Sequence, residues 1–227
     1  MPTILQIETA TQVCSAAVSV NGQTVALKEL AANNIHASSL TIFIQEAMDA
    51  AGLAFADLDA VAVSKGPGSY TGLRIGVSTA KGLCFALDKP LIGIDTLKMM
   101  AAGFLAEQPD YQGLICPMID ARRMEVFTAL FDSSLQEAEP VLARIIDEES
   151  YRVLLETQNI AFIGDGAVKC ADVIQHQNAA FHLCNYNSAA GISGLANEAF
   201  LAGAFEDVAY FEPFYLKDFV VTAPKKR

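Results

Sequence analysis

The sequence predicts an α/β protein made of two related halves with a cleft between them. Apolar residues make up 52% of the 227 residues and charged residues only 18%, which is typical of a well-buried globular chain. Strand-like and helix-like runs alternate in both halves, and this mixture indicates sheets covered by helices. We expect one domain over residues 1–103 and a second over residues 104–227, tightly joined because no low-complexity linker separates them.

The first half is predicted to form three short strands and then alternating helices and strands. The Asn21-Gly22 pair between two apolar runs is the strongest local signal for a hairpin. Ser38 or Ser39 is a suitable cap for the first helix, and Gly52 is suited to end it. The expected elements are the strands Thr3–Glu8, Ser15–Val20 and Gln23–Leu30, the helix Ser38–Ala51, the strand Asp59–Lys65, the helix Gly72–Leu87 and the strand Leu91–Ile94.

The second half begins like the first. Glu8 and Asp120 each end an apolar strand, and a polar turn and a further strand follow each acid. This self-similarity favours duplicated domains, and a chance resemblance of two β-hairpins is the alternative. The expected elements are the strands Leu114–Asp120 and Glu125–Phe131, the helix Asp147–Glu156, the strand Ile160–Gly164, the helix Ser188–Ala204 and an aromatic segment, Glu206–Phe219, that caps the second domain.

Charge and cysteine usage limit the function. A net charge of −11 argues against a protein that binds nucleic acid alone, because such proteins neutralise phosphates with clustered Lys and Arg. The cluster Lys225-Lys226-Arg227 is typical of a solvated tail, with a contact to RNA or an acidic partner as the alternative. Scattered cysteines, no apolar run of roughly 18 residues and no signal-peptide pattern lead us to expect a cytoplasmic protein without a membrane partner.

A glycine-rich loop, Gly66-Pro67-Gly68-Ser69-Tyr70-Thr71-Gly72, follows the strand Asp59–Lys65. A strand that leads into such a loop and then into a helix presents backbone N–H groups suited to an anion. The loop has neither the Gly-Lys-Ser/Thr ending of a Walker motif nor the dinucleotide fingerprint. The alternative is that its glycines permit only a sharp turn and close helix packing. The candidate phosphate contacts are Gly66, Gly68, Ser69 and Thr71.

The two helices of the first half are more apolar than a surface helix needs. Arg74 and Lys81 are the charged residues of the second helix, and Glu46 and Asp49 those of the first. Such helices should be covered on two sides, by their own sheet and by either the other domain or another chain. The candidate interface residues are Leu40, Phe43, Ile44, Ala47, Met48, Gly72, Leu73, Ile75, Gly76, Val77, Ala80, Leu83 and Cys84.

Small residues recur every four positions in the second helix, at Gly72, Gly76 and Ala80. We expect them to form a smooth groove that points away from the chain's own sheet and lets another helix approach. On this hypothesis Gly76→Arg abolishes association and leaves the monomer folded, because an unpaired buried charge costs several kcal/mol.

Several motifs resemble the bacterial TsaB (YeaZ-like) family, and the likeness runs nearly from end to end. It is weakest between about residues 135 and 160 and in the last dozen residues. The segments that carry the resemblance are Gly66–Gly76, Thr79–Leu83, Pro90–Gly93, Gly52-Leu53, Leu58–Val63, Asp120–Phe127 and Gly164–Ala167.

The resemblance implies an actin/hexokinase-like (ASKHA) two-lobed fold and a non-catalytic scaffold or activator role. The implied partners are TsaD, a related catalytic subunit, and the ATPase TsaE, with a homodimer when the chain is alone. Together they move a threonylcarbamoyl group onto the adenosine beside the anticodon of ANN-decoding tRNAs, so tRNA is reached only through the complex. No intrinsic cofactor is implied, and ATP or ADP with Mg at the interface of the assembled complex is left open.

A metal centre is not expected. The resemblance implies that TsaD carries a His-x-x-x-His pair after the strand that corresponds to Leu91–Ile94. Alignment on this strand places Thr96 and Met100 at those positions, and both are poor ligands for a hydrolytic zinc or iron site. No two of the histidines have the i, i+4 spacing of a helical metal site; they are His36, His176 and His182.

A free-standing enzyme is the contrasting hypothesis. A peptidase-like hydrolase needs a nucleophile such as Ser69 or Cys116, yet no histidine lies near either in sequence. An ASKHA-type kinase needs an acid such as Asp120 or Asp165 as its base, whereas Asp120 and the following Arg122-Arg123 fit a turn. The family's first strand usually ends Ile-Asp-Thr, and Glu8 replaces that Asp, which disfavours nucleotide binding in the first lobe.

Overall fold

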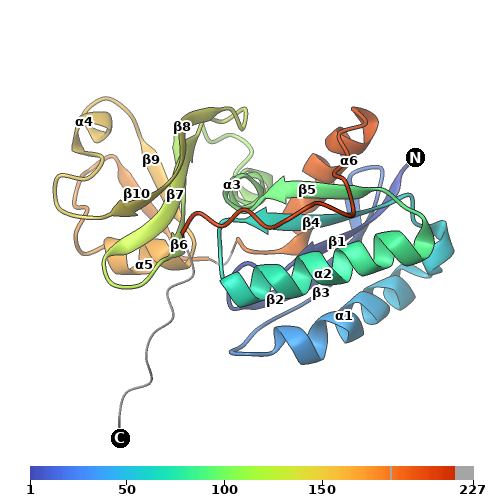
Figure 1. Cartoon of the computed structure of the whole chain (residues 1–227). Helices are drawn as coiled ribbons and strands as arrows, with labels where there is room; N and C mark the ends of the chain where they lie inside the picture. The colour runs from blue at the N-terminus through green and yellow to red at the C-terminus, as the bar shows by residue number, and fades with distance from the viewer. Residues whose placement is uncertain (185, 218–227) are drawn as a thin grey trace, which may run out of the picture.

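Two five-stranded sheets with the same topology form the framework of the computed structural model, which describes residues 1–184 and 186–217 (Figure 1). Their strand orders are β3-β2-β1-β4-β5 and β10-β9-β6-β7-β8. In each sheet the first three strands along the chain are antiparallel neighbours, and the last two are parallel additions. The repeated topology confirms the expected two-lobed α/β fold with duplicated halves.

The strands and helices of the first half extend close to their expected bounds. Asn21 and Gly22 both have positive φ, of 52° and 79°, so they form the predicted hairpin turn. The elements are β1 (Thr3–Glu8), β2 (Val13–Val20), β3 (Gln23–Ala31), α1 (His36–Ala51), the 3₁₀ helix η1 (Phe55–Asp57), β4 (Ala60–Gly66), α2 (Tyr70–Leu87), β5 (Leu91–Asp95) and α3 (Thr96–Glu107).

The second half contains elements that the sequence pattern did not indicate, namely β8, α5 and β10. The expected helix Asp147–Glu156 is reduced to α4, and the expected helix Ser188–Ala204 is a 3₁₀ helix followed by α6. The elements are β6 (Leu114–Asp120), β7 (Glu125–Phe131), β8 (Glu137–Ile145), α4 (Arg152–Leu155), β9 (Ile160–Ile163), α5 (Asp165–Cys170), β10 (Ala179–His182), η2 (Ala189–Ile192) and α6 (Ser193–Leu201).

The core has three apolar layers separated by the two sheets. On β1, Leu5 and Ile7 face the layer beneath α1 and α2, whereas Ile4 faces the layer between the sheets. That middle layer contains Leu97 and Phe104 of α3 and residues of both sheets. The outer face of the second sheet forms the third layer. The expected boundary between residues 103 and 104 lies inside α3, and the division into domains stays a prediction.

The chain crosses back to the first sheet after the second sheet is complete. η2 packs against β1 and β2, and α6 packs against β1 and β5. Figure 1 shows α6 beside the first sheet, on the side opposite to α1 and α2. The first sheet is therefore covered on both faces.

Residues 206–217, here called the C-terminal strap, lie along the first half. The Glu206 N–H donates to Leu91 O over 2.9 Å, and the Phe214 N–H donates to Lys65 O over 2.7 Å. Phe211 is buried in the layer beneath α1 and α2. The expectation that this segment caps the second domain is wrong for these residues, because its apolar and backbone contacts are with the first sheet and α2. The basic cluster at residues 225–227 lies outside the described residues.

Candidate functional site

The glycine loop packs tightly on the turn after β1. The Ser69 N–H donates to Ala10 O over 2.6 Å, and the Thr9 hydroxyl donates to Gly72 O over 2.8 Å. A Cβ added at Gly68 or Gly72 would lie well under 3.0 Å from the backbone of this turn. The glycines are thus required for close packing, which is the structural alternative considered above.

Several backbone donors of the loop are already used. The Gly66 N–H donates to Thr96 Oγ1 over 3.1 Å, and the Gly72 N–H donates to Ser69 Oγ over 3.2 Å. Ser69 caps α2 in this way, whereas its own side chain and that of Thr71 are exposed. Phosphate binding by this loop stays a prediction.

Glu8 is a fully buried carboxyl group at the end of β1. Its Oε1 accepts a hydrogen bond from the Ala10 N–H over 2.6 Å. Among the described residues, Glu8 Oε2 and the buried Ser64 Oγ have no partner of full hydrogen-bond geometry. Burial raises the pKa of Glu8 to about 7, and the nearby Ser64 hydroxyl and Ala10 amide only partly oppose that rise.

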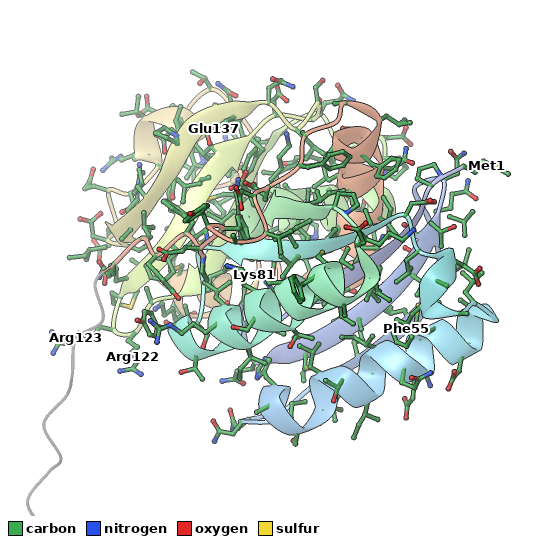
Figure 2. The ribbon with its side chains drawn as sticks, turned by 45° about the vertical axis from the view of Figure 1, so that its right-hand side comes forward. Met1, Phe55, Lys81, Arg122, Arg123 and Glu137 are labelled. Atoms are coloured by element: carbon green, nitrogen blue, oxygen red, sulfur yellow. The ribbon has the colours of Figure 1, made fainter. Side chains whose placement is uncertain are left out.

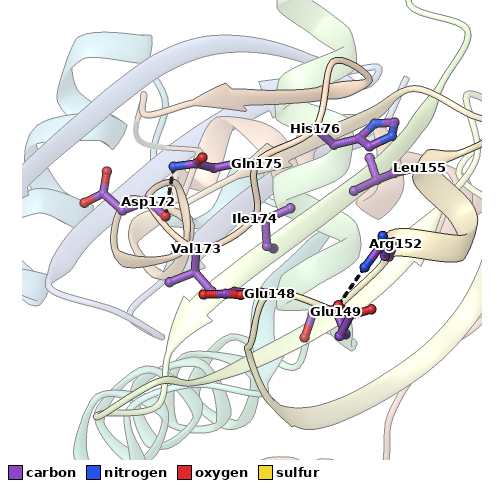
Figure 3. Close-up of a pocket in the computed structure, with 10 residues that line it drawn as sticks. Glu148, Glu149, Arg152, Leu155, Asp172, Val173, Ile174, Gln175 and His176 are labelled. Carbon is purple, nitrogen blue, oxygen red and sulfur yellow. Dashed lines mark hydrogen bonds and ion pairs between the residues drawn. The ribbon is translucent and has the colours of Figure 1, made fainter.

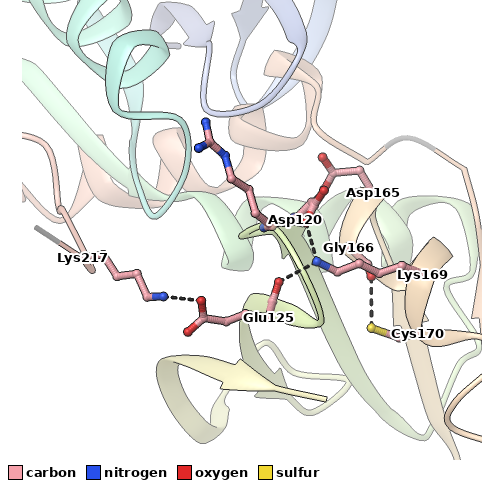
Figure 4. Close-up of polar contacts among 8 residues, drawn as sticks. Asp120, Glu125, Asp165, Gly166, Lys169, Cys170 and Lys217 are labelled. Carbon is pink, nitrogen blue, oxygen red and sulfur yellow. Dashed lines mark hydrogen bonds and ion pairs between the residues drawn. The ribbon is translucent and has the colours of Figure 1, made fainter. Parts of the chain in front are cut away.

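The equivalent acid of the second half has a different environment. Asp120 is exposed; it accepts a hydrogen bond from the Arg122 N–H over 2.8 Å and forms an ion pair with Lys169. Lys169 also donates to Glu125 O, and Figure 4 shows its ammonium between these two acceptors. Asp165 accepts a hydrogen bond from the Asp120 N–H over 3.1 Å. Burial raises the pKa of Asp165, this hydrogen bond partly opposes the rise, and the negative charge of Asp120 adds to it. Asp120 therefore acts within the turn, as its sequence context suggested.

The candidate nucleophiles, Cys116 and Ser69, lack the activation that nucleophilic catalysis requires. Burial raises the pKa of Cys116 to about 12, so this thiol stays protonated near neutral pH, and its Sγ contacts Thr128 Oγ1 at 3.2 Å. Ser69 Oγ accepts a hydrogen bond from the Gly72 N–H, and among the described residues it makes no hydrogen bond to a histidine. His36 is buried, with Nε2 3.0 Å from Val13 O. This arrangement does not favour a peptidase-like hydrolase.

Thr96 and Met100 are both part of the packed interior of the chain. Thr96 is fully buried and its hydroxyl accepts from Gly66, while Met100 is fully buried in the middle layer. The described residues contain no group of three or more His, Cys, Asp or Glu side chains placed to hold a metal.

Most of the candidate interface residues are buried inside the chain. A Cβ added at Gly76 would lie well under 3.0 Å from Thr9 Oγ1 and 3.6 Å from Ile7 Cγ2, so this side of α2 faces β1. The expectation that the small-residue side points away from the sheet is wrong, because close contact with β1 requires those small residues. The buried members are Leu40, Ile44, Ala47, Met48, Gly72, Leu73, Gly76, Val77, Ala80 and Cys84; Phe43, Ile75 and Leu83 are half-buried.

The outward side of α2 carries a different set of small residues. Thr71, Ser78 and Gly82 are exposed, and nothing lies within 4 Å of a Cβ added at Gly82. Two large apolar side chains also lie on the outer surface of these helices, Ile42 on α1 at 54% exposure and Phe85 on α2 at 87%. None of these outer residues was among the candidate interface residues, of which only Phe43, Ile75 and Leu83 are partly accessible.

Two pockets are lined by none of the glycine-loop residues 66–72. One, of about 470 Å³, lies in the second half and contains Glu149, Arg152 and His176, with an ion pair between Glu149 and Arg152 (Figure 3). It contains none of the candidate site residues. The other, of about 670 Å³, lies between the C-terminal strap, Asp95 of the first sheet and Glu137 of β8.

α2 holds the C-terminal strap through contacts that the sequence pattern did not indicate. Arg74 Nε donates to the Tyr215 hydroxyl over 3.1 Å, and its guanidinium lies 4.2 Å from the centroid of the Tyr70 ring. Lys81, labelled in Figure 2, donates to the carbonyls of residues 209 and 211. The aromatic composition of the strap was a signal that it packs, but it did not indicate against which half.

Comparisons with known proteins agree with the sequence resemblance. A family model described as "TsaD: tRNA N6-adenosine threonylcarbamoyltransferase" matches residues 29–225. The chain is 37% identical over 126 residues to "tRNA threonylcarbamoyladenosine biosynthesis protein TsaB" of Escherichia coli, a match that covers 56% of this chain and 53% of the relative. The Bacillus subtilis protein of the same name is 47% identical over 75 residues, which cover 33% of this chain and 31% of the relative. The chain thus spans about half the length, or less, of these curated relatives.

Solved structures share the fold over nearly the whole chain. "YeaZ from Pseudomonas aeruginosa" has a TM-score of 0.81 and 26% identity, and the match covers 95% of this chain and 100% of that one. A second Pseudomonas aeruginosa structure, of "an uncharacterized protein with similarity to peptidase YEAZ", has a TM-score of 0.84 and 25% identity, covering 96% and 100%. The TsaD family model matches the chain over residues 29–225, and the curated relatives and these structures agree that the chain belongs to the TsaB/YeaZ family.

Proposed function

We propose that this chain is a non-catalytic subunit in the synthesis of threonylcarbamoyladenosine in tRNA. In this proposal it pairs with TsaD, the catalytic relative, in a system that also contains the ATPase TsaE. The system transfers the threonylcarbamoyl group to the adenosine beside the anticodon of ANN-decoding tRNAs, and the chain contacts tRNA only as part of the complex. We place the protein in the cytoplasm; no described helix combines the length and apolar character needed to cross a bilayer.

The observation that carries the non-catalytic role is the environment of Thr96 and Met100. These residues stand where the family resemblance implies metal ligands in TsaD, yet both are fully buried. The Thr96 hydroxyl accepts a hydrogen bond from the Gly66 N–H, and Met100 packs in the layer between the sheets. A threonine hydroxyl and a thioether in such positions suit core packing better than hydrolytic metal chemistry.

The outer surface of α1 and α2 supports the partner role. Phe85 and Ile42 expose apolar surface there, and Gly82 permits the close approach of another backbone. Because TsaD is a relative of the same fold, the surface that binds TsaD can also pair with its own copy around a two-fold axis. We therefore expect homodimer and heterodimer formation to compete. ATP or ADP with Mg, if bound, belongs in this proposal to the junction of the assembled complex.

The test is reconstitution with purified proteins. Phosphate release from ATP and threonylcarbamoyl transfer to tRNA are measured for the chain alone, for TsaD with TsaE, and for all three together. We expect background activity for the chain alone and turnover only when all three are present. Sustained turnover by the chain alone that is lost in Asp120→Asn or Ser69→Ala would refute the non-catalytic role. Turnover by TsaD and TsaE without the chain would refute the requirement for it.

A further inference from the structure

The hairpin turn between β6 and β7 has an unusual sequence for its backbone conformation. Arg122 and Arg123 both adopt the left-handed region, with φ of 71° and 51°. The turn is closed by hydrogen bonds from the Ala121 N–H to Glu125 O, over 3.1 Å, and from the Glu125 N–H to Arg122 O, over 3.2 Å. Side chains with a Cβ are disfavoured in this region, and hairpin turns with two such residues favour Asn-Gly.

The first sheet provides an internal comparison. The shorter turn between β2 and β3 also has two consecutive left-handed residues, and there they are Asn21 and Gly22. The chain thus uses the favoured pair in one hairpin and two arginines in the other. Strained residues of this kind gather at binding and catalytic sites, where the side chain matters more than the backbone preference.

The two arginines are also electrically uncompensated. Among the described residues, neither guanidinium takes part in an ion pair or a hydrogen bond, and both side chains are exposed. The carboxylates beside them are already neutralised, because Asp120 pairs with Lys169 and Glu125 pairs with Lys217. In a chain of net charge −11, this turn is therefore a local positive site.

The turn is held firmly and its arginines point outward. Asp120 accepts from the Arg122 N–H over 2.8 Å and also binds Lys169, so the base of the turn is fixed. Figure 2 shows Arg122 and Arg123 projecting from the end of the second sheet, at the outer edge of the molecule. Two guanidinium groups on consecutive residues of a rigid turn can each offer a fork of N–H donors to an anion without a large loss of conformational entropy.

We propose that Arg122 and Arg123 form a contact site for consecutive phosphates of an RNA backbone. The inference rests on the proposed function, because tRNA is then the nucleic acid that the assembled complex holds. The uncompensated charge on consecutive residues suits an RNA strand, which presents phosphates in a row. The acidic remainder of the chain repels RNA, so the contact is limited to this turn and acts only when the partner holds the tRNA.

The main test replaces both arginines by Asn and Gly, the residues of the turn between β2 and β3. Arg122→Asn with Arg123→Gly removes the two charges and relieves the backbone strain, so the melting temperature of the isolated chain should rise by about 2–4 °C. The complex with TsaD is assembled and checked by sedimentation, and its dissociation constant for tRNA is measured from 50 to 300 mM KCl. Two lost phosphate contacts should lower the slope of log K against log salt by about 1–2 and weaken binding about 25-fold near 0.1 M salt.

Two controls separate charge from position. Lys28→Asn with Arg152→Asn removes the same charge from two exposed ion pairs elsewhere and should leave the tRNA affinity unchanged. Arg122→Lys with Arg123→Lys keeps the charge and should retain most of the salt slope.

A gain in melting temperature, unchanged assembly and weaker, less salt-dependent tRNA binding would support the proposal. An unchanged tRNA affinity, or an equal loss in the Lys28 and Arg152 control, would overturn it. Loss of assembly with TsaD would also overturn it, because the turn would then contact an acidic surface of the protein partner. Failure of the unaltered chain to assemble with TsaD would instead refute the proposed function and, with it, this inference.

Discussion

Two glycines of the same helix should respond in opposite ways to a single methyl group. Gly76 faces β1, where an added Cβ would lie well under 3.0 Å from Thr9 Oγ1 and 3.4 Å from Thr9 Cβ. Gly82 is nearly two turns further along α2, and nothing lies within 4 Å of a Cβ added there. Gly76→Ala and Gly82→Ala therefore make the same chemical change in the core and in open space.

The expected magnitudes follow from these contacts. Replacing glycine by alanine inside a helix stabilises it by about 0.5–1 kcal/mol, and this gain is common to both variants. At Gly76 the methyl group must displace Thr9, which overpacks the layer by about 1–3 kcal/mol and disturbs the hydrogen bond of about 1 kcal/mol to Gly72 O. We expect Gly76→Ala to lose about 1–3 kcal/mol and Gly82→Ala to gain about 0.5–1 kcal/mol.

Urea unfolding followed by circular dichroism measures both variants against the unaltered chain. With equal slopes, the midpoint should fall for Gly76→Ala and rise for Gly82→Ala. A Gly76→Ala chain as stable as the unaltered one would refute the packing of this side of α2 on β1. A strongly destabilised Gly82→Ala chain would refute the open environment of Gly82.

Three further predictions concern pH, association and the C-terminal strap. The pKa of Glu8 in the folded chain, about 7, lies above its ordinary value of 4.5, so its stabilising contribution is complete below pH 4.5 and is lost as pH rises through 7. Glu8→Gln should remove this loss, which is about 3 kcal/mol in the free energy of unfolding. The measurement is the urea unfolding midpoint, which should fall less between pH 5 and pH 8 in the variant than in the unaltered chain. The Gly82→Arg chain should fold normally, yet sedimentation should show that it has lost both self-association and TsaD binding. If it retains both, the interface does not include the outer surface of α2. Lys81→Met removes two hydrogen bonds to strap carbonyls and should speed proteolytic cleavage near Phe211, whereas an unchanged rate would show that other contacts hold the strap.

The elements with strong local signals could be predicted from sequence, and the others had no such signal. Asn21 and Gly22 determine their turn through their backbone preferences alone, and these preferences can be predicted without knowledge of the tertiary structure. α3 has buried residues around most of its circumference, from Leu97 to Phe104, so its apolar residues follow no helical period. β8 is an edge strand of mostly half-buried or exposed residues, and it lacks the strict alternation that indicates a strand.

The direction in which each side of α2 faces could not be predicted from the local sequence. Four-residue spacing correctly groups Gly72, Gly76 and Ala80 on one side of α2, but spacing does not say which neighbour that side meets. The neighbour is β1, because Thr9 and Ile7 lie against it. Orientation depends on tertiary packing, so the four-residue spacing identified the small-residue side of α2 but not the direction in which that side faces.

The two strand-ending acids show how duplicated hairpins diverge in chemistry. Glu8 and Asp120 have the same place in two sheets of the same topology, as their similar sequence contexts led us to expect for duplicated domains. Yet η2, which follows the second sheet in the chain, packs over β1 and β2, and Glu8 is fully buried with a raised pKa. Asp120 stays exposed and is paired with Lys169. An ASKHA-type kinase with Asp120 as its base needs this carboxylate free to take a proton from a bound substrate, so its ion pair with Lys169 favours the scaffold over the free-standing kinase.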